Sequence, residues 1–188
     1  APCRGQMSWN GWTESLSAEL LRLLCGRFAG RVLREYTEVI GVILPEILPM
    51  KGFRQHNQHH RYDVLEHTLR ALEQIPATPV LRLAALYHDA GKPRCFTLDE
   101  NGVGHFYGHP KISAALAEQR CLALRLPNAV REEVVFLAHV HDVPMDGTQK
   151  TIRRRLAQYG ELRLRHVLMM KKADGVGRGT HPEYIGQY

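Results

Sequence analysis

No apolar run in this sequence of 188 residues approaches the length that a membrane span requires. The longest, Val39–Leu48, is short and is interrupted by Gly41, Pro45 and Glu46. Residues 1–12 also lack a basic start followed by an apolar stretch, so we expect no secretory signal. These absences argue against a membrane-spanning helix and predict no membrane partner.

Cysteine is scarce and scattered, and no two cysteines form a C-x-x-C pair. This spacing excludes a zinc ribbon, and without an export signal we expect no disulfides. Internal repeats and low-complexity tracts are missing as well. We therefore predict a cytoplasmic protein. The cysteines are Cys3, Cys25, Cys95 and Cys121.

Two-residue alternation over several consecutive strands is also missing, which argues against an all-β or a parallel α/β fold. Apolar residues recur at helical spacing instead, and we expect an all-α bundle. One stretch, 96–106, has Asn101-Gly102 at its middle and is typical of a short β-hairpin. The expected helices cover about 17–25, 30–44, 63–75, 79–90, 110–125, 128–139, 148–159 and 161–173.

Three local signals refine this outline. Ser17 is a candidate N-cap of the first helix. Gly91, followed by Lys92 and Pro93, predicts a left-handed cap at the end of the fourth helix. A polar loop is expected between 49 and 61, and an irregular glycine-rich tail from Gly175 onward.

Histidine is in excess, with 11 residues, and the net charge is +6. Several arginines cluster in 153–155 and at Arg163 and Arg165. A basic balance suits a partner rich in phosphate, such as a nucleotide or RNA. Taken alone, however, the same arginines are explained more simply by a solvated cationic helix face.

The pair His88-Asp89 falls where the fourth helix is expected to end. Adjacent residues cannot share a helix face, but at a helix terminus both side chains can converge on one ion. Imidazole and carboxylate ligands together suit a divalent metal such as Mn, Fe, Ni, Mg or Zn. Two ligands are too few for a stable site, so others must come from elsewhere. The candidates next to apolar helical stripes are His67, His109, His141 with His139 as its alternative, and Asp174.

The order of these residues resembles the HD superfamily of metal-dependent phosphohydrolases. The resemblance implies a helical bundle with a metal among its helices. His67, His88, Asp89 and Asp174 would hold the primary ion. His109 and His141 match the histidines that some members use for a second metal or for substrate phosphate.

A closer resemblance, over roughly residues 13–180, is to the HD region of bacterial CCA-adding enzymes, which are tRNA nucleotidyltransferases. It rests on the segments 62–68, 88–93, 104–110 and 162–179. It predicts an N-terminal helical segment at 1–50 and an HD domain at 51–188. The D-x-D carboxylate pair of the nucleotidyltransferase head is missing, so we do not expect this chain to add CCA. The chain is either a piece of a longer enzyme or a stand-alone HD protein.

The resemblance implies hydrolysis of phosphomonoesters or 2′,3′-cyclic nucleotides, including RNA ends. Asp89 would bind the metal and bridge two ions where two are present. Lys92 would either neutralise a substrate phosphate or complement the helix C-terminus. His60 would contact substrate or be an ordinary loop residue. The alternatives are a non-catalytic tRNA-binding module and a hydrolase of free nucleotides or alarmones.

Overall fold

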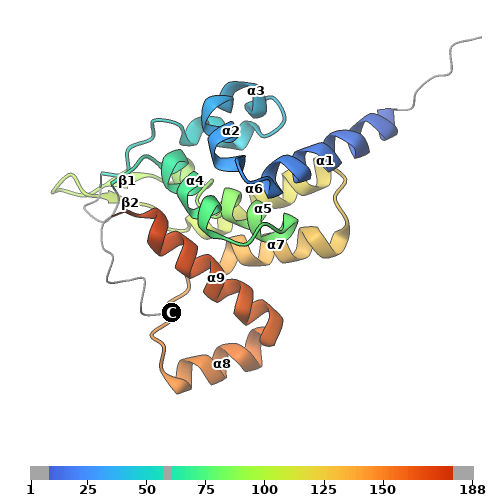
Figure 1. Ribbon diagram of the computed structural model, residues 1–188. Helices are drawn as coiled ribbons and strands as arrows, with labels where there is room; N and C mark the ends of the chain where they lie inside the picture. Colours follow the sequence, from blue (N-terminus) through green and yellow to red (C-terminus); the bar gives the residue numbers. More distant parts are fainter. Residues whose placement is uncertain (1–8, 57–60, 180–188) are drawn as a thin grey trace, which may run out of the picture.

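The computed structural model describes residues 9–56 and 61–179 of the chain (Figure 1). The described part is a bundle of helices with one two-stranded antiparallel sheet, which confirms the predicted all-α class. None of its helices is both long and apolar enough to cross a membrane. In chain order the elements are α1 (Trp9–Cys25), α2 (Ala29–Glu35), α3 (Thr37–Gly41), the 3-10 helix η1 (Pro45–Met50), α4 (Val64–Gln74), α5 (Pro79–Tyr87), the 3-10 helix η2 (Lys92–Arg94), β1 (Thr97–Leu98), β2 (Gly104–His105), α6 (His109–Ala123), α7 (Asn128–Val140), α8 (Gln149–Tyr159) and α9 (Glu161–Gly177).

Helix α5 forms the centre of the bundle. Every residue from Leu81 to Tyr87 is buried, and the helix contacts α1, α4, α6, α7 and α9 (Figure 1). A helix that is buried on all sides is expected to be apolar all round, as α5 is except for Arg82. Because α5 ends inside the bundle, His88 and Asp89, which follow it directly, are buried in the interior.

Helices α4 and α9 pack against each other (Figure 1). Their backbones approach closely at Gly177, where an added Cβ would lie 3.0 Å from the carbonyl oxygen of His67. A larger side chain at this point would push the helices apart. The absence of a side chain at Gly177 therefore lets the two helices approach closely enough for Asp174 of α9 to contact His67 of α4.

The predicted β-hairpin is confirmed. Strands β1 and β2 pair with Thr97 opposite His105, and Gly102 turns the chain with a φ of 74°. The amide of Gly104 donates to the carbonyl oxygen of His56 at 2.7 Å, which fastens the hairpin to the loop before α4. The hairpin leads directly into α6 through residues 106–108.

The predicted start of the first helix is wrong. Helix α1 begins at Trp9, so Ser17 lies inside it and is not an N-cap. Its buried hydroxyl instead donates to the carbonyl oxygen of Leu124 at 2.6 Å, at the end of α6. The local pattern predicted that the Ser17 hydroxyl would bond to the backbone at the helix start. Its actual partner lies 107 residues away in the chain.

The second expected helix is two helices. The backbone departs from helical geometry at Tyr36, with φ −111° and ψ 32°, and α3 starts at the next residue. The hydroxyl of Thr37 donates back to the carbonyl oxygen of Leu33 at 2.7 Å, a bond that competes with regular helix geometry. The break turns α3 and η1 back towards the core, where Leu44 and Ile47 are buried.

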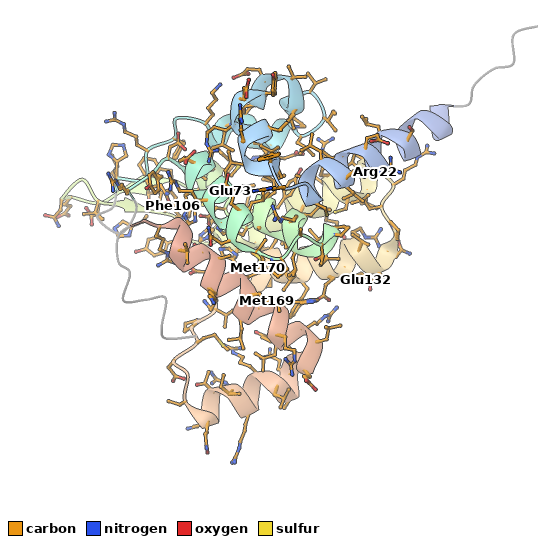
Figure 2. The ribbon with its side chains drawn as sticks, viewed as in Figure 1. Arg22, Glu73, Phe106, Glu132, Met169 and Met170 are labelled. Carbon is orange, nitrogen blue, oxygen red and sulfur yellow. The ribbon has the colours of Figure 1, made fainter. Side chains whose placement is uncertain are left out.

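The last helix is longer than predicted, because α9 continues through Gly175 to Gly177. Met169 and Met170 lie on different sides of it: Met170 is buried and Met169 is 39% exposed (Figure 2). Of these two neighbouring methionines, only Met170 therefore packs in the core. Helix α8 packs against α9 and lies at the lower edge of the molecule in Figure 1.

Candidate metal centre

Six histidine and aspartate side chains from five helical elements meet at the end of α5. Asp89 is central to this cluster and is 2% exposed. All six were identified as candidates from the sequence. They are His67 in α4, His88 and Asp89 directly after α5, His109 at the start of α6, His141 directly after α7, and Asp174 in α9.

The two carboxylate oxygens of Asp89 face different pairs of histidines. Its Oδ2 lies 3.2 Å from Nε2 of His67 and 3.4 Å from Nε2 of His88. Its Oδ1 lies 3.3 Å from Nε2 of His109 and 3.6 Å from Nε2 of His141. Each triad brings its donor atoms close enough to ligate one ion, and both triads are buried.

Asp174 extends the first triad. Its Oδ1 lies 3.1 Å from Nε2 of His67 and 3.8 Å from Nε2 of His88. Its Oδ2 accepts a hydrogen bond from Arg178 at 2.7 Å, one turn later in the chain. Arg178 thereby fixes the carboxylate with one oxygen directed at the histidines.

Backbone carbonyl groups orient three of the four imidazoles. Nδ1 of His88, His109 and His141 lies 2.7 to 2.9 Å from the carbonyl oxygen three residues earlier in each case. A carbonyl oxygen accepts, so Nδ1 carries the proton and Nε2 of the neutral ring offers a lone pair. The Nε2 atoms of His109 and His141 are only 3.1 Å apart. Two lone pairs that face each other favour a cation between or beside them.

Gly91 has a different role from the predicted left-handed cap. Its φ of −78° and ψ of −19° are ordinary right-handed values, so that prediction is wrong. An added Cβ would lie 2.6 Å from the carbonyl oxygen of His109 and 2.8 Å from the amide nitrogen of Ser113. The amide of Gly91 also donates to the hydroxyl of Ser113 at 2.9 Å. Glycine is needed because α6 passes directly over this backbone, which places His109 beside Asp89.

Lys92 is directed into the cluster. Its ammonium group lies 2.7 Å from Oδ2 of Asp89 and donates to Oε1 of Gln55 at 2.8 Å. The side chain is buried, and its Nζ lies 5.3 Å from the ring centroid of Phe106. A buried ammonium beside a carboxylate supplies a fixed positive charge at the edge of the site.

Burial and neighbouring charged groups shift the pKa values of these side chains in opposite directions. Burial lowers the pKa of His67, but hydrogen bonds to Asp174 and Asp89 outweigh burial and raise this pKa to about 9. Burial raises the pKa of Asp89, yet Lys92 and His88 hold it well below its ordinary value. The pKa of Asp174 is held low against burial by His67 and His88. Both carboxylates therefore carry negative charge at neutral pH.

This donor set fits a divalent cation. Neutral imidazole nitrogens and ionised carboxylates ligate Mn, Fe, Ni and Zn, and the carboxylates also suit Mg. Two negative charges buried among lone pairs are costly unless a cation accompanies them. Lys92, Arg178 and His67, whose pKa of about 9 makes it a cation at neutral pH, supply part of that compensation. A bound ion would take the place of the His67 proton, because a metal ligand must be deprotonated.

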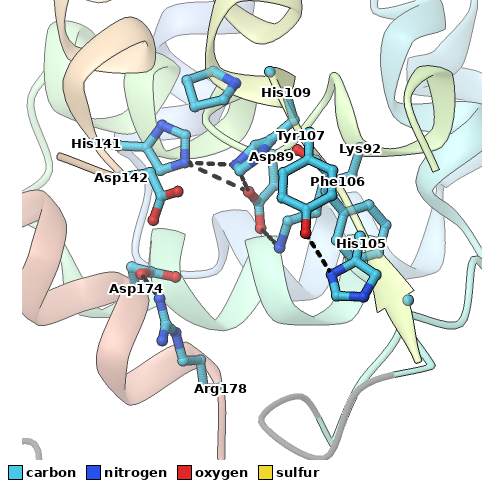
Figure 3. Close-up of a pocket in the computed structure, with 13 residues that line it drawn as sticks. Asp89, Lys92, His105, Phe106, Tyr107, His109, His141, Asp142, Asp174 and Arg178 are labelled. Atoms are coloured by element: carbon cyan, nitrogen blue, oxygen red, sulfur yellow. Dashed lines mark hydrogen bonds and ion pairs between the residues drawn. The ribbon is translucent and has the colours of Figure 1, made fainter. Parts of the chain in front are cut away.

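A cavity of about 370 Å³ opens onto the cluster (Figure 3). Asp89, Lys92, His109, His141 and Asp174 lie along it. The hairpin and the segment after it form one side through residues 104–108, while Asp142 and Arg178 lie on the other. The volume lies within the range of roughly 300–1,000 Å³ that is usual for small-molecule sites.

Other predicted positions have different locations. His139, the alternative to His141, is exposed and points away from the cluster, whereas His141 is buried in it. His60 lies outside the described residues. The sequence analysis assigned no role to Gln55, Tyr107 or Arg178, although Tyr107 lies in the segment 104–110 and Arg178 in the segment 162–179. A signal for these two residues was therefore present, whereas Gln55 lies in none of the segments.

Comparison with known families agrees with this geometry, since a family model described as the HD domain matches residues 57–178. The chain belongs to the HD domain family. The match contains every residue of the cluster. Within this HD domain, the pair that follows α5 is His88-Asp89.

Curated relatives extend the comparison beyond the HD domain. The chain is 32% identical to the A-adding tRNA nucleotidyltransferase of Deinococcus radiodurans over 193 residues, covering 98% of this chain and 44% of that protein. It is 34% identical to the CC-adding tRNA nucleotidyltransferase of Thermus thermophilus over 187 residues, covering 93% of this chain and 43% of that protein. The multifunctional CCA protein of Legionella pneumophila matches over 108 residues at 35% identity, covering 55% of this chain and 26% of that protein. The chain therefore spans less than half the length of these relatives.

Proposed function

We propose that this HD domain is a metal-dependent phosphohydrolase that acts on phosphomonoesters or 2′,3′-cyclic nucleotides, including those at RNA ends. One observation carries the proposal: two buried triads of nitrogen and oxygen donors share Asp89 beside an open cavity. Membership of the HD domain family supports the same chemistry.

In this proposal His67, His88, Asp89 and Asp174 hold the primary ion, and His109 and His141 hold a second ion or the substrate phosphate. When bound, a divalent ion polarises a phosphoryl oxygen and activates water for attack. The backbone carbonyls behind His88, His109 and His141 keep the proton on Nδ1 and so keep Nε2 available. Asp89, whose two oxygens face the two groups of histidines, would contribute a ligand to the primary ion and to a second ion where two are present.

Lys92 supplies positive charge for the phosphate. Its ammonium group lies 2.7 Å from Asp89 and is held by Gln55, so it needs little rearrangement to face a substrate oxygen at the same place. A preorganised cation in a buried site stabilises the charge that grows on phosphoryl oxygens during hydrolysis. The orientation of Lys92 favours this role over that of a cap for the end of α5.

Three further expectations remain proposals. His60, which lies outside the described residues, contacts the substrate. Residues 1–50 form a helical segment that precedes an HD domain at 51–188. The protein works in the cytoplasm, which agrees with the free thiols of Cys25, Cys95 and Cys121.

The test follows hydrolysis of 2′,3′-cyclic AMP with Ni, Mn or Mg, beside an EDTA control. We expect turnover that requires the metal and falls by at least about 100-fold in Asp89→Ala. Asp146→Ala, which removes an exposed aspartate outside the cavity, should leave the rate unchanged. Circular dichroism of both variants separates a loss of catalysis from unfolding.

Metal-dependent turnover that survives in folded Asp89→Ala would contradict the assignment. Turnover restricted to free nucleotides or alarmones would favour that substrate class instead.

A second candidate function is a non-catalytic module that binds tRNA. The observation that favours it is the similarity, along nearly the whole chain, to proteins named tRNA nucleotidyltransferases. Arg153 and Arg154 add two exposed positive charges on α8. No turnover with any metal, together with salt-sensitive tRNA binding, would support this function.

A further inference from the structure

An aromatic side chain stands exposed at the edge of the metal cavity. Tyr107 follows β2, lines the cavity and is 78% exposed, although it lies two residues from the buried His109. Figure 3 shows its ring beside His105, on the opposite side of the cavity from His141 and Asp142. Single exposed aromatic rings are common on protein surfaces, but this one borders a polar cavity, where it can contact a bound ligand.

The ring of Tyr107 is held in place by its neighbours. It lies parallel to the imidazole of His105, with 5° between the planes and 5.3 Å between the centroids. The phenolic oxygen lies 3.3 Å from Nδ1 of His105, whose Nε2 lies 3.0 Å from Oδ2 of Asp99. Asp99 in turn accepts hydrogen bonds from the amides of the hairpin turn.

Aromatic packing supports this pair from below. Phe106, between the two residues, also lines the cavity, and its ring packs on Phe96 with centroids 5.5 Å apart. Phe96 packs on Phe53 at 5.3 Å, and the backbone of the hairpin is bonded to His56. Phe106 is therefore anchored by other aromatic rings, whereas Tyr107 is the ring that stands exposed at the cavity.

We propose that Tyr107, backed by His105, is a stacking platform for a nucleobase, so that the site selects nucleoside phosphates over phosphate esters without a base. This inference rests on the proposed function for the site that it serves. A flat aromatic ring held open to solvent binds bases by stacking, because every base has a π-face. The phosphate then lies towards Lys92 and the histidines, and the base lies over the hairpin.

The distribution of side chains supports this direction of binding. The far side of the cavity carries Asp142 and Asp174, and the guanidinium of Arg178 there is already paired with Asp174. The hairpin side offers the stacked tyrosine and histidine rings. A substrate with its phosphate at Lys92 and the histidines and its flat base over the hairpin matches this arrangement.

The first arm of the test measures binding without catalysis. Calorimetry in EDTA compares adenosine 5′-phosphate with ribose 5-phosphate, a ligand of the same charge that lacks a base. We expect Tyr107→Leu to weaken binding of the adenosine ligand by about tenfold and to leave the ribose ligand unchanged. Tyr107→Trp, which keeps a flat ring, should retain the preference. Tyr36→Leu is the matched control, since Tyr36 is also exposed but lies between α2 and α3, outside the cavity.

The second arm measures kcat/KM with metal for 2′,3′-cyclic AMP and for glycerol phosphate. A loss confined to the nucleotide supports the platform. An equal loss on both substrates would mean that Tyr107 shapes the metal site, and no loss on either would mean that it has no role in binding. Both results overturn the inference. If the wild-type protein hydrolyses neither substrate, the proposed function fails, while the calorimetric arm still decides whether the platform exists.

Discussion

At the scale of single residues, the site depends on Asp89 and on the glycine two positions later. Asp89 joins two groups of histidines through its two oxygens. Gly91 allows α6 to pass so closely that His109 reaches the second oxygen. Asp89 supplies the negative charge, and the missing side chain of Gly91 leaves room for His109 to approach it.

Gly91→Ala tests the need for that space. The new Cβ would meet backbone atoms of His109 and Ser113, which cannot rotate away. We expect a loss of about 1–3 kcal/mol in the free energy of unfolding and weaker Mn²⁺ binding, because α6 must shift with His109. Urea denaturation and metal titration measure the two effects.

The matched variant is Gly175→Ala in α9, where nothing lies within 4 Å of an added Cβ. Alanine favours a helix over glycine by about 1 kcal/mol, so this change should be neutral or stabilising. Equal stability and equal metal affinity in both variants would show that the approach of α6 to Gly91 has no consequence.

At the scale of elements, a buried carboxylate connects η1 to the central helix and to α6. Glu46 of η1 accepts from the hydroxyl of Tyr87 at 2.9 Å and pairs with Arg120 at 2.8 Å. Burial raises the pKa of Tyr87 well above its ordinary value, and the charge of Glu46 adds to the effect. The cluster fixes the end of α5, directly before His88.

Glu46→Gln removes the charge and keeps the shape. We expect a loss of about 2 kcal/mol in stability because Arg120 loses its partner. This is less than the roughly 3–5 kcal/mol of a fully buried pair, since the Arg120 side chain is 20% exposed. Glu38→Gln is the comparison, because its ion pair with Lys51 lies at the surface and should change stability by less than about 1 kcal/mol. Thermal denaturation of both variants decides, and a Glu46→Gln protein as stable as Glu38→Gln would contradict the role of the cluster.

At the scale of the whole molecule, part of the positive charge is paired with carboxylates of the protein and is less available to bind a phosphate-rich partner. The net charge is +6, and the arginine cluster contributes to it. Arg163 pairs with Glu133, Arg165 pairs with Glu161, and Arg155 bonds to Gln158. Arg153 and Arg154 remain on the exposed face of α8, which lies at the opposite end of the molecule from α1 in Figure 1.

The tRNA-binding function predicts a local effect of these two charges. Replacing Arg153 and Arg154 with alanine should weaken tRNA binding and reduce the slope of log affinity against log salt by about 2, because two phosphate contacts are lost. Filter binding across a salt series measures both. The control replaces Arg22 and Arg31, which are also exposed but lie on α1 and α2 and pair with Glu19 and Glu35. An equal loss in the control would mean that net charge alone attracts the RNA.

The sequence by itself determined much of the fold and the identity of the cluster. Helical periodicity and the Asn101-Gly102 turn are local properties, so the all-α class and the hairpin could be predicted from neighbouring residues. The ordered set of histidines and aspartates gave the six residues that the structure brings together. Local signals were wrong where a distant partner competed, as at Ser17, whose hydroxyl bonds to the end of α6.

The tertiary structure alone decided how these residues work together. Segments that are far apart in the chain are joined by the two oxygens of Asp89, by the passage of α6 over Gly91 and by the hydrogen bond that Lys92 donates to Gln55. The exposed ring of Tyr107 can contact a ligand only because the hairpin borders the cavity beside Asp89. Residue types and their order specify which chemistry is available. Distances between atoms of different helices depend on packing, and packing is not encoded in any single stretch of sequence.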